Sequence, residues 1–291
     1  MSAPFSSPID ASTRYCAVFG HPIKHSASPA MQNAGIATLG LNWRYLAFDV
    51  DPANLREALL GAKLLGFVGV NLTVPHKLLA VEMVDALDES ARTWGAVNTV
   101  RFETESGQTM ARGFNTDAVA ITRSIREDLG AELRGAKVLL LGAGGAGRTA
   151  ALKLAAEGVG ELYLVNRTEA KAAAVAKEIA DRHPGVKLHV GYPGTKVDLL
   201  LNATSLGLKP DDAMPVDEGT FPLSQAGAVY DMIYRPAETP LLQAAKAAGC
   251  RTANGLGMLL YQGAKALEIW TGKPAPIGVM RRALTQNVYG H

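Results

Sequence analysis

The chain has few of the features that mark disulfide-rich, membrane-spanning or nucleic-acid-binding proteins. It has only two cysteines, Cys16 and Cys250, which lie far apart in apolar stretches, so we expect two buried free thiols and no disulfide. Its net charge of +2 gives no electrostatic reason to expect a nucleic-acid or membrane partner. The most apolar segment, residues 138–156, contains Arg148, Lys153 and four glycines, which makes it a poor transmembrane helix.

Charged residues and targeting signals are also scarce. Charged residues make up 19% of the chain and hydrophobic residues 48%, a balance that argues against disorder. Residues 1–13 lack a basic stretch followed by an apolar run, so we expect no signal peptide and a cytoplasmic protein. The six histidines show no metal-ligand spacing, so we expect no metal site. Glycine is in excess, at 30 of 291 residues, which predicts tight turns and places where the backbone approaches a ligand.

Strands and helices alternate through two regions, and a chain of 291 residues is long enough for about two domains. The first region contains five predicted strands, of which the last two form a hairpin, at residues 15–19, 43–50, 69–74, 97–102 and 108–113. Its two predicted helices cover residues 28–40 and 52–65. Ser28 followed by Pro29 is typical of a helix start at which serine is the N-cap.

The second region follows a predicted helix at residues 118–128 and has the pattern of an α/β protein. Its six predicted strands cover residues 137–141, 161–165, 186–190, 197–201, 228–232 and 251–253. Helical segments lie between most of them, notably at residues 147–157 and 169–182, which indicates a Rossmann-type doubly wound parallel sheet. Two further helical segments lie in residues 255–289, and their periodicity leaves open whether they extend this domain or fold back on the first.

A glycine-rich segment in the second region predicts a dinucleotide site. Residues 142–147 match the pattern G-x-G-x-x-G, directly after an apolar strand and at the start of a helix. Gly142 would make the tight turn, Gly144 would let the backbone approach a pyrophosphate, and Gly147 would let the helix pack on the strand. The helix N-terminus then carries partial positive charge toward the phosphates. The alternative is a plain glycine-rich turn.

The end of the next predicted strand indicates which dinucleotide is bound. NAD sites usually have an acidic residue there for the ribose 2′-hydroxyl, and this chain has Asn166, Arg167 and Thr168 instead. Arg167 can cover a 2′-phosphate, and the two neutral side chains can form hydrogen bonds beside it. Arg148, just inside the glycine-loop helix, is a candidate second cation. We therefore expect NADP rather than NAD.

Four short segments carry polar groups that a globular core would not need. Residues 25–29 place two serine hydroxyls at a helix start, where they can bind a carboxylate. The alternative for Ser28 is that it serves only as the N-cap of the helix. Residues 71–77 place Asn71 and Thr73 on one face of a predicted strand, with Lys77 just beyond it. The remaining polar groups are Asn98 and residues 115–117, at the proposed domain junction. A cleft between two domains is where such groups usually act.

The chain resembles the shikimate dehydrogenase family in motifs that run in the family order from Tyr15 onward. The matching segments are residues 19–29, 71–77, 95–99, 115–117, 142–148, 166–168, 202–205, 230–232 and 255–259. The resemblance implies reversible reduction of 3-dehydroshikimate to shikimate with NADPH, in aromatic amino-acid biosynthesis. The first dozen residues lie outside it and are expected to form a mobile extension.

The resemblance also implies the domain organisation. Residues 1–116 and 255–291 would form a substrate-binding α/β domain, and residues 117–254 the NADP-binding Rossmann domain, with a cleft between them. The C-terminal helices would then fold back on the first domain. The family includes monomers and homodimers, and the sequence does not distinguish them.

Residue roles follow by motif position. Lys77 and Asp117 would form the catalytic pair, and both would touch the substrate. Other substrate contacts would come from Ser26, Ser28, Asn71, Thr73, Asn98, Tyr234 and Gln262. The residues expected to line the cofactor site are Glu89, Gly142, Ala143, Gly144, Gly145, Ala146, Arg148, Asn166, Arg167, Thr168, Lys171, Met232 and Gly255.

The chemistry of these residue types agrees with ketone reduction. A lysine ammonium beside the carbonyl oxygen stabilises the alkoxide charge that develops during hydride transfer and can deliver a proton. Whether Lys77 or Asp117 is the formal acid and base stays open. Three rival interpretations also stay open: a dehydrogenase that accepts quinate or NAD, a catalytically silent NADP-binding sensor, and a methyltransferase that binds S-adenosylmethionine on the glycine loop.

Overall fold

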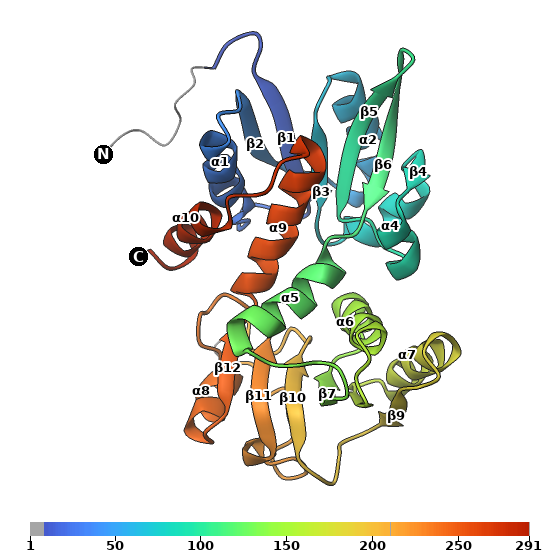
Figure 1. Ribbon diagram of the computed structural model, residues 1–291, viewed down its shortest axis with the longest axis vertical. Helices are drawn as coiled ribbons and strands as arrows, with labels where there is room; N and C mark the ends of the chain where they lie inside the picture. The colour runs from blue at the N-terminus through green and yellow to red at the C-terminus, as the bar shows by residue number, and fades with distance from the viewer. Residues whose placement is uncertain (1–8, 210, 291) are drawn as a thin grey trace. The chain divides into compact units, whose positions relative to one another are not determined.

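The computed structural model describes residues 9–209 and 211–290 (Figure 1). These residues form two compact units: unit 1 contains the residues up to Asp117 and those from Leu259 onward, and unit 2 is Ala118–Met258. The junctions expected from the sequence, after residues 116 and 254, lie one and four residues before the junctions of these units. The expected N-terminal extension falls largely on residues 1–8, which lie outside the described residues.

Unit 1 contains a mixed six-stranded sheet with the order β2-β1-β3-β5-β6-β4. Its strands are β1 (Arg14–Gly20), β2 (Trp43–Asp49), β3 (Gly69–Leu72), β4 (Ala86–Leu87), β5 (Thr99–Glu105) and β6 (Gln108–Phe114). β1 pairs in parallel with β2 and β3, whereas β5 pairs antiparallel with β3 and β6. The predicted hairpin is confirmed: Ser106 and Gly107 both have positive φ, as a tight two-residue turn requires.

Six helices of unit 1 surround this sheet or follow it in the chain. They are α1 (Ser28–Thr38), α2 (Leu55–Leu64), α3 (His76–Leu79), α4 (Glu89–Trp94), α9 (Leu256–Thr271, which begins in unit 2) and α10 (Ile277–Tyr289). Figure 1 shows α10 beside α1, and the two helices pack together. The Trp270 indole N–H on α9 donates to the Val100 carbonyl on β5 at 3.0 Å. The C-terminal helices therefore fold back on unit 1, as the resemblance implied.

Two local predictions in unit 1 are wrong. β3 ends at Leu72 rather than at residue 74, because the Thr73 carbonyl accepts from the His76 N–H at 2.8 Å and turns the chain out of the sheet. Thr73 therefore does not share a strand face with Asn71. The N-cap of α1 is Ala27, and Ser28 is already helical, so Ser28 is not the cap. The sequence also gave no prediction of α3, α4 or β4.

Unit 2 contains six parallel strands in the order β12-β11-β10-β7-β8-β9, which confirms the Rossmann-type prediction. They are β7 (Lys137–Leu141), β8 (Glu161–Val165), β9 (Lys187–Val190), β10 (Val197–Asn202), β11 (Ala226–Asp231) and β12 (Arg251–Asn254). The helices are α5 (Asp117–Leu129), α6 (Gly145–Ala156), α7 (Glu169–Arg182) and α8 (Pro240–Ala247). The strand order reverses between β7 and β10, and ligands of such sheets bind at the carboxyl ends of the strands beside this reversal.

Burial agrees with the composition. β7 is almost wholly buried, as an apolar run in a parallel sheet should be, and β10 is buried except for Asp198. Cys16 and Cys250 are buried free thiols, as predicted, and burial raises the pKa of each thiol. Within residues 9–209 and 211–290, no helix is both long and apolar enough to cross a membrane. In the same residues, no three histidine, cysteine or acidic side chains are placed to share a metal ion.

Candidate active site

Lys77 and Asp117 form an ion pair in unit 1. Lys77 Nζ lies 2.7 Å from Asp117 Oδ2, with the lysine side chain 31% exposed and the aspartate side chain 11% exposed. Lys77 lies on the short helix α3, and Asp117 is the first residue of α5. The Lys77 carbonyl accepts from the Val97 N–H at 2.8 Å, which ties α3 to the segment before Asn98. The ammonium is therefore fixed in direction yet reachable from solvent.

Asn98 holds the segment that carries Asp117. Its Oδ1 accepts from the Thr116 N–H at 2.8 Å, and its Nδ2 donates to Thr116 Oγ1 at 2.9 Å. Asn98 is 1% exposed and Thr116 also 1%, so these bonds are sheltered from water. The amide thus fixes Thr116, the residue directly before Asp117.

Asn71 on β3 extends the same buried network. Its Nδ2 donates to the Asn98 carbonyl at 3.2 Å and to Thr99 Oγ1 at 3.0 Å, and its Oδ1 accepts from the Tyr45 hydroxyl at 2.8 Å. The structure therefore brings together four of the residues predicted from sequence: Lys77, Asp117, Asn71 and Asn98.

The other predicted substrate residues lie on separate elements. Ser26 is half-buried in the turn before α1, and its hydroxyl accepts a long 3.4 Å bond from the N–H of Ser28, which is buried. Thr73 is half-buried just beyond β3. Gln262, on α9, donates from its side chain to the Leu259 carbonyl of the same helix at 2.8 Å. Tyr234 belongs to unit 2, where burial raises the pKa of its phenol.

The glycine loop of unit 2 connects β7 to α6 at the strand reversal. Gly142 has φ +101°, which only glycine adopts readily, and a side chain there would meet the Ala203 backbone beyond β10 at 3.0 Å. A side chain at Gly147 would meet the Gly142 carbonyl oxygen at 2.1 Å. In contrast, Gly144 and Gly145 face open space, with nothing within 4 Å of an added Cβ. The loop is therefore closely packed at Gly142 and Gly147 and open at Gly144 and Gly145, and a pyrophosphate site needs such open space beside the backbone.

The residues after β8 divide into one that supports the loop and others that face solvent. Asn166 Oδ1 accepts from the Ala143 N–H at 3.0 Å, and its Nδ2 donates to the Thr168 carbonyl at 2.8 Å. Arg167 and Lys171 are exposed, and neither side chain has an ion-pair partner among the described residues. Their charges are therefore free to meet an anion.

Arg148 differs from these two cations. Its Nε and Nη2 lie 2.8 and 2.5 Å from the two carboxylate oxygens of Glu178 on α7, and Arg182 also pairs with Glu178. This bidentate pair commits the Arg148 guanidinium to a neighbouring helix. Arg148 is thus less available to a phosphate than the sequence suggested.

A buried carboxylate organises the two loops that follow β10 and β11. Asp231, which is 0% exposed, accepts from Asn202 Nδ2 at 3.0 Å, from the Ile233 N–H at 3.0 Å and from Thr239 Oγ1 at 2.6 Å. Burial raises the pKa of Asp231. Gly255 lies against the same loop, where a side chain would meet the Met232 carbonyl at 2.0 Å. Met232 and Gly255 are therefore adjacent.

The comparisons with known proteins agree along the chain. Three family descriptions match: "Shikimate dehydrogenase substrate binding domain" over residues 18–100, "Shikimate / quinate 5-dehydrogenase" over 124–191, and "Shikimate 5'-dehydrogenase C-terminal domain" over 255–285. A shikimate dehydrogenase (NADP(+)) of Methanopyrus kandleri is 43% identical over 291 residues, covering 97% of this chain and 99% of that protein. The chain belongs to the shikimate dehydrogenase family.

Solved structures of two similar proteins have the same fold. The crystal structure of a shikimate dehydrogenase in complex with NADP+ has a TM-score of 0.86 and 39% identity, and the match covers 98% of this chain and 99% of that one. A ligand-free 5-ketofructose reductase from a Gluconobacter strain has a TM-score of 0.83 and 35% identity, with 95% and 99% coverage. The shikimate dehydrogenase fold thus also occurs in a protein named for another ketone.

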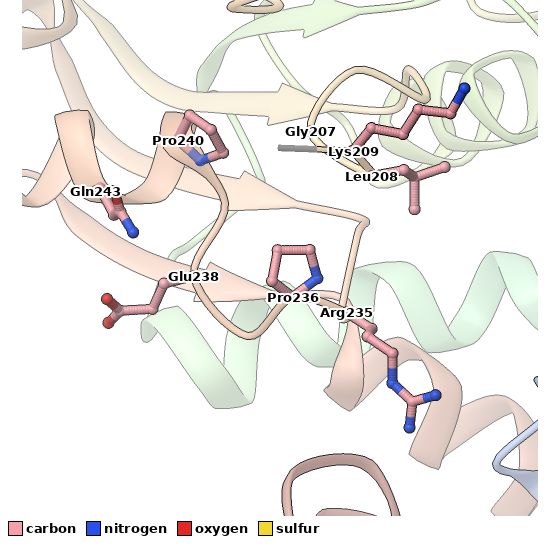
Figure 2. Close-up of a pocket in the computed structure, with 8 residues that line it drawn as sticks. All are labelled: Gly207, Leu208, Lys209, Arg235, Pro236, Glu238, Pro240 and Gln243. Carbon is pink, nitrogen blue, oxygen red and sulfur yellow. The ribbon is translucent and has the colours of Figure 1, made fainter. Parts of the chain in front are cut away.

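Unit 2 also has a pocket of about 480 Å³ between the loops after β10 and β11 (Figure 2). Its lining residues are Gly207, Leu208, Lys209, Arg235, Pro236, Glu238, Pro240 and Gln243. Figure 2 shows the charged ends of Lys209 and Arg235 pointing away from each other rather than toward a common point. None of the site residues predicted from the family resemblance lines this pocket, so we do not assign it to the cofactor.

The sequence analysis assigned no role to three polar residues of the unit 1 network: Tyr45, Thr99 and Thr116. Each is buried and bonds to Asn71 or Asn98. Thr99 and Thr116 stand beside predicted residues in the chain, and that adjacency was the available signal. Tyr45 lies on a different strand, where an aromatic residue in an alternating pattern has the same appearance as a core residue.

Proposed function

We propose that this protein is an NADP-dependent shikimate dehydrogenase, which reversibly reduces 3-dehydroshikimate to shikimate in the cytoplasm. The observation that carries the proposal is the 2.7 Å Lys77–Asp117 pair, bound to the buried amide network of Asn98 and Asn71. Family membership supplies the substrate class. The free cations after β8 supply the preference for NADP.

In the proposed mechanism, bound NADPH supplies the hydride to the substrate carbonyl carbon. The Lys77 ammonium lies beside the carbonyl oxygen, stabilises the negative charge that develops there, and donates a proton to it. Asp117 Oδ2 accepts a hydrogen bond from Lys77 Nζ and thereby orients the ammonium. In the reverse direction the same pair receives the proton of the shikimate hydroxyl.

The remaining substrate roles follow from the polarity of each group. Ser26 and Ser28 bind the substrate carboxylate near the start of α1, and the Ser28 hydroxyl turns from Tyr45 to the carboxylate in order to donate to it. Asn71, Thr73, Asn98 and Gln262 bind the ring hydroxyls, and Tyr234 is a further candidate substrate residue. Asn98 keeps one amide hydrogen for the substrate, because only one is used by Thr116.

The proposed NADP site extends along the carboxyl ends of β7 and β8. The backbone of residues 142–146 cradles the pyrophosphate, and Asn166 holds that loop through the Ala143 N–H. Arg167, Thr168 and Lys171 bind the 2′-phosphate. Met232 and Gly255 line the nicotinamide end, and Glu89 is a further candidate cofactor residue. We give Arg148 a secondary role because Glu178 already holds it.

The proposal is tested by assaying shikimate and quinate, each with NADP and with NAD, through the absorbance of NADPH or NADH. We expect the highest kcat/KM for shikimate with NADP, since the end of β8 has no acidic residue for a ribose 2′-hydroxyl. 5-Ketofructose, tested for reduction with NADPH, is the third substrate. Turnover of quinate with NAD but not of shikimate with NADP would overturn the proposal. NADP binding without turnover of any of the three would indicate a sensor.

A pair of glycine variants tests the cofactor loop. Gly147→Ala should lower the free energy of unfolding by about 1–3 kcal/mol, because its Cβ would overlap the Gly142 carbonyl. Gly144→Ala should leave stability nearly unchanged, since Gly144 has φ −75° and faces open space, but should weaken NADP binding. Denaturant titration measures the first effect and calorimetric titration with NADP the second. Unchanged NADP affinity in Gly144→Ala would place the pyrophosphate elsewhere.

A further inference from the structure

Tyr45, on β2, is a fully buried polar side chain with no role in the proposed mechanism. It is 0% exposed. Its backbone N–H donates to Asn33 Oδ1 on α1 at 2.9 Å, and its carbonyl accepts from Asn33 Nδ2 at 2.8 Å. Its ring centroid lies 6.1 Å from that of Trp270 on α9. Contacts from two helices thus fix the ring and determine where the hydroxyl lies.

The Tyr45 hydroxyl lies between two of the proposed substrate residues. It donates its only proton to Asn71 Oδ1 at 2.8 Å, so in its hydrogen bond with the Ser28 side chain it accepts and the Ser28 hydroxyl donates. Burial raises the pKa of the phenol well above its ordinary value. The hydroxyl therefore keeps its proton at every physiological pH and can always donate it.

The other partners of Asn71 require the same orientation of its amide as the Tyr45 hydroxyl does. The Asn98 carbonyl can only accept a hydrogen bond, so the Asn71 NH₂ group must face it, and the second amide hydrogen goes to Thr99 Oγ1. Both donor positions of Asn71 are thereby used within the protein. Its Oδ1 accepts one bond from Tyr45 and has no other partner among the described residues, which leaves one lone pair for a ligand.

We propose that Tyr45 is a positioning residue of the substrate site, which holds Asn71 so that Asn71 offers the substrate a hydrogen-bond acceptor and no donor. This inference rests on the proposed function. A ring hydroxyl of the substrate can donate to the free lone pair of Asn71 Oδ1. A carbonyl at the same ring position would face that oxygen with a lone pair of its own and would be repelled. Tyr45 thus contributes to substrate selection through Asn71 without touching the substrate.

Tyr45→Phe, which removes only the hydroxyl, tests this proposal. We expect the KM for shikimate to rise roughly 3- to 10-fold, the effect of one lost hydrogen bond, with kcat and the KM for NADP nearly unchanged. Tyr230→Phe in unit 2 is the matched control. Tyr230 is also 0% exposed, and its hydroxyl bonds only to groups away from the proposed substrate residues, with Ser124 Oγ at 2.7 Å. It should cost similar stability and leave the KM for shikimate unchanged.

A double-mutant cycle separates a positioning role from general destabilisation. If Tyr45 acts through Asn71, the double variant Tyr45→Phe/Asn71→Ala should have the same shikimate KM as Asn71→Ala alone. Additive increases in KM, or an equal rise in Tyr230→Phe, would overturn the proposal. Should Tyr45→Phe fail to fold, Thr99→Val removes another partner of Asn71 and must raise the KM for shikimate. Wild-type enzyme that does not turn over shikimate would instead refute the proposed function itself.

Discussion

Replacing Lys77 with alanine is expected to lower kcat for shikimate oxidation by roughly 10²–10⁴ while leaving NADP affinity nearly unchanged. The variant loses the cation that stabilises the developing alkoxide and the group that transfers the proton. It keeps the glycine loop and the cations after β8, which belong to unit 2. Steady-state kinetics with shikimate and calorimetric titration with NADP measure the two quantities.

Lys63→Ala is the matched control for this variant. Lys63 Nζ lies 2.9 Å from Asp85 Oδ2, so this substitution also breaks a lysine–aspartate pair of unit 1, but one outside the proposed site. It should leave kcat within about twofold of wild type, because the pair lies outside the proposed site. It should also leave the fold intact, because exposed ion pairs contribute little to stability. Loss of NADP binding in Lys77→Ala, with kcat retained at saturating cofactor, would show that Lys77 is a cofactor ligand instead.

Replacing Arg167 with alanine is expected to weaken NADP binding roughly 10- to 100-fold and to leave NAD binding nearly unchanged. Its guanidinium has no ion-pair partner among the described residues, so a 2′-phosphate can take a charge-assisted hydrogen bond from it. NAD lacks that phosphate and cannot use this interaction. The dissociation constants for NADP and NAD are measured for wild type and for Arg167→Ala, and the change in their ratio tests the prediction.

Arg182→Ala controls for the loss of one positive charge near the site. Arg182 lies on α7, the helix that follows Arg167, and pairs with Glu178 at 2.8 Å. Its removal changes the net charge equally, so any general electrostatic effect appears in both variants. Equal weakening of NADP and NAD by Arg167→Ala would mean that Arg167 does not read the phosphate.

Most of the fold could be predicted because its signals are local. The strand at residues 137–141 is a continuous apolar run, and α7 covers the predicted residues 169–182. β4 and α4 were missed since a two-residue strand has no periodicity, and the Asp88 cap of α4 precedes only six helical residues. Ser-Pro favours a helix start at which the serine is the cap, but the chain enters the helix one residue earlier, with Ala27 as the cap and Ser28 already helical.

The site was predictable where family motifs stand in the sequence. The resemblance implied that Lys77 and Asp117 form a pair, and the structure places Lys77 Nζ 2.7 Å from Asp117 Oδ2. What sequence could not give was the direction of each amide. The sequence predicts that Asn71 and Asn166 bind ligands, yet most of the hydrogen bonds of each side-chain amide are made within the protein. Such hydrogen bonds depend on contacts between segments that are distant in the sequence, and they leave no periodic pattern in it.

The division of unit 1 between the two ends of the chain affects how the protein folds during synthesis. Residues 118–258 of unit 2 leave the ribosome as one stretch and can pack without waiting for later sequence. Unit 1 must wait for α9 and α10, whose Trp270 bonds to Val100 and whose Met280 lies against Gly35 of α1. Until then the apolar face of α1 that receives these helices stays open to water. The half of the protein that is translated first is therefore the half that finishes folding last.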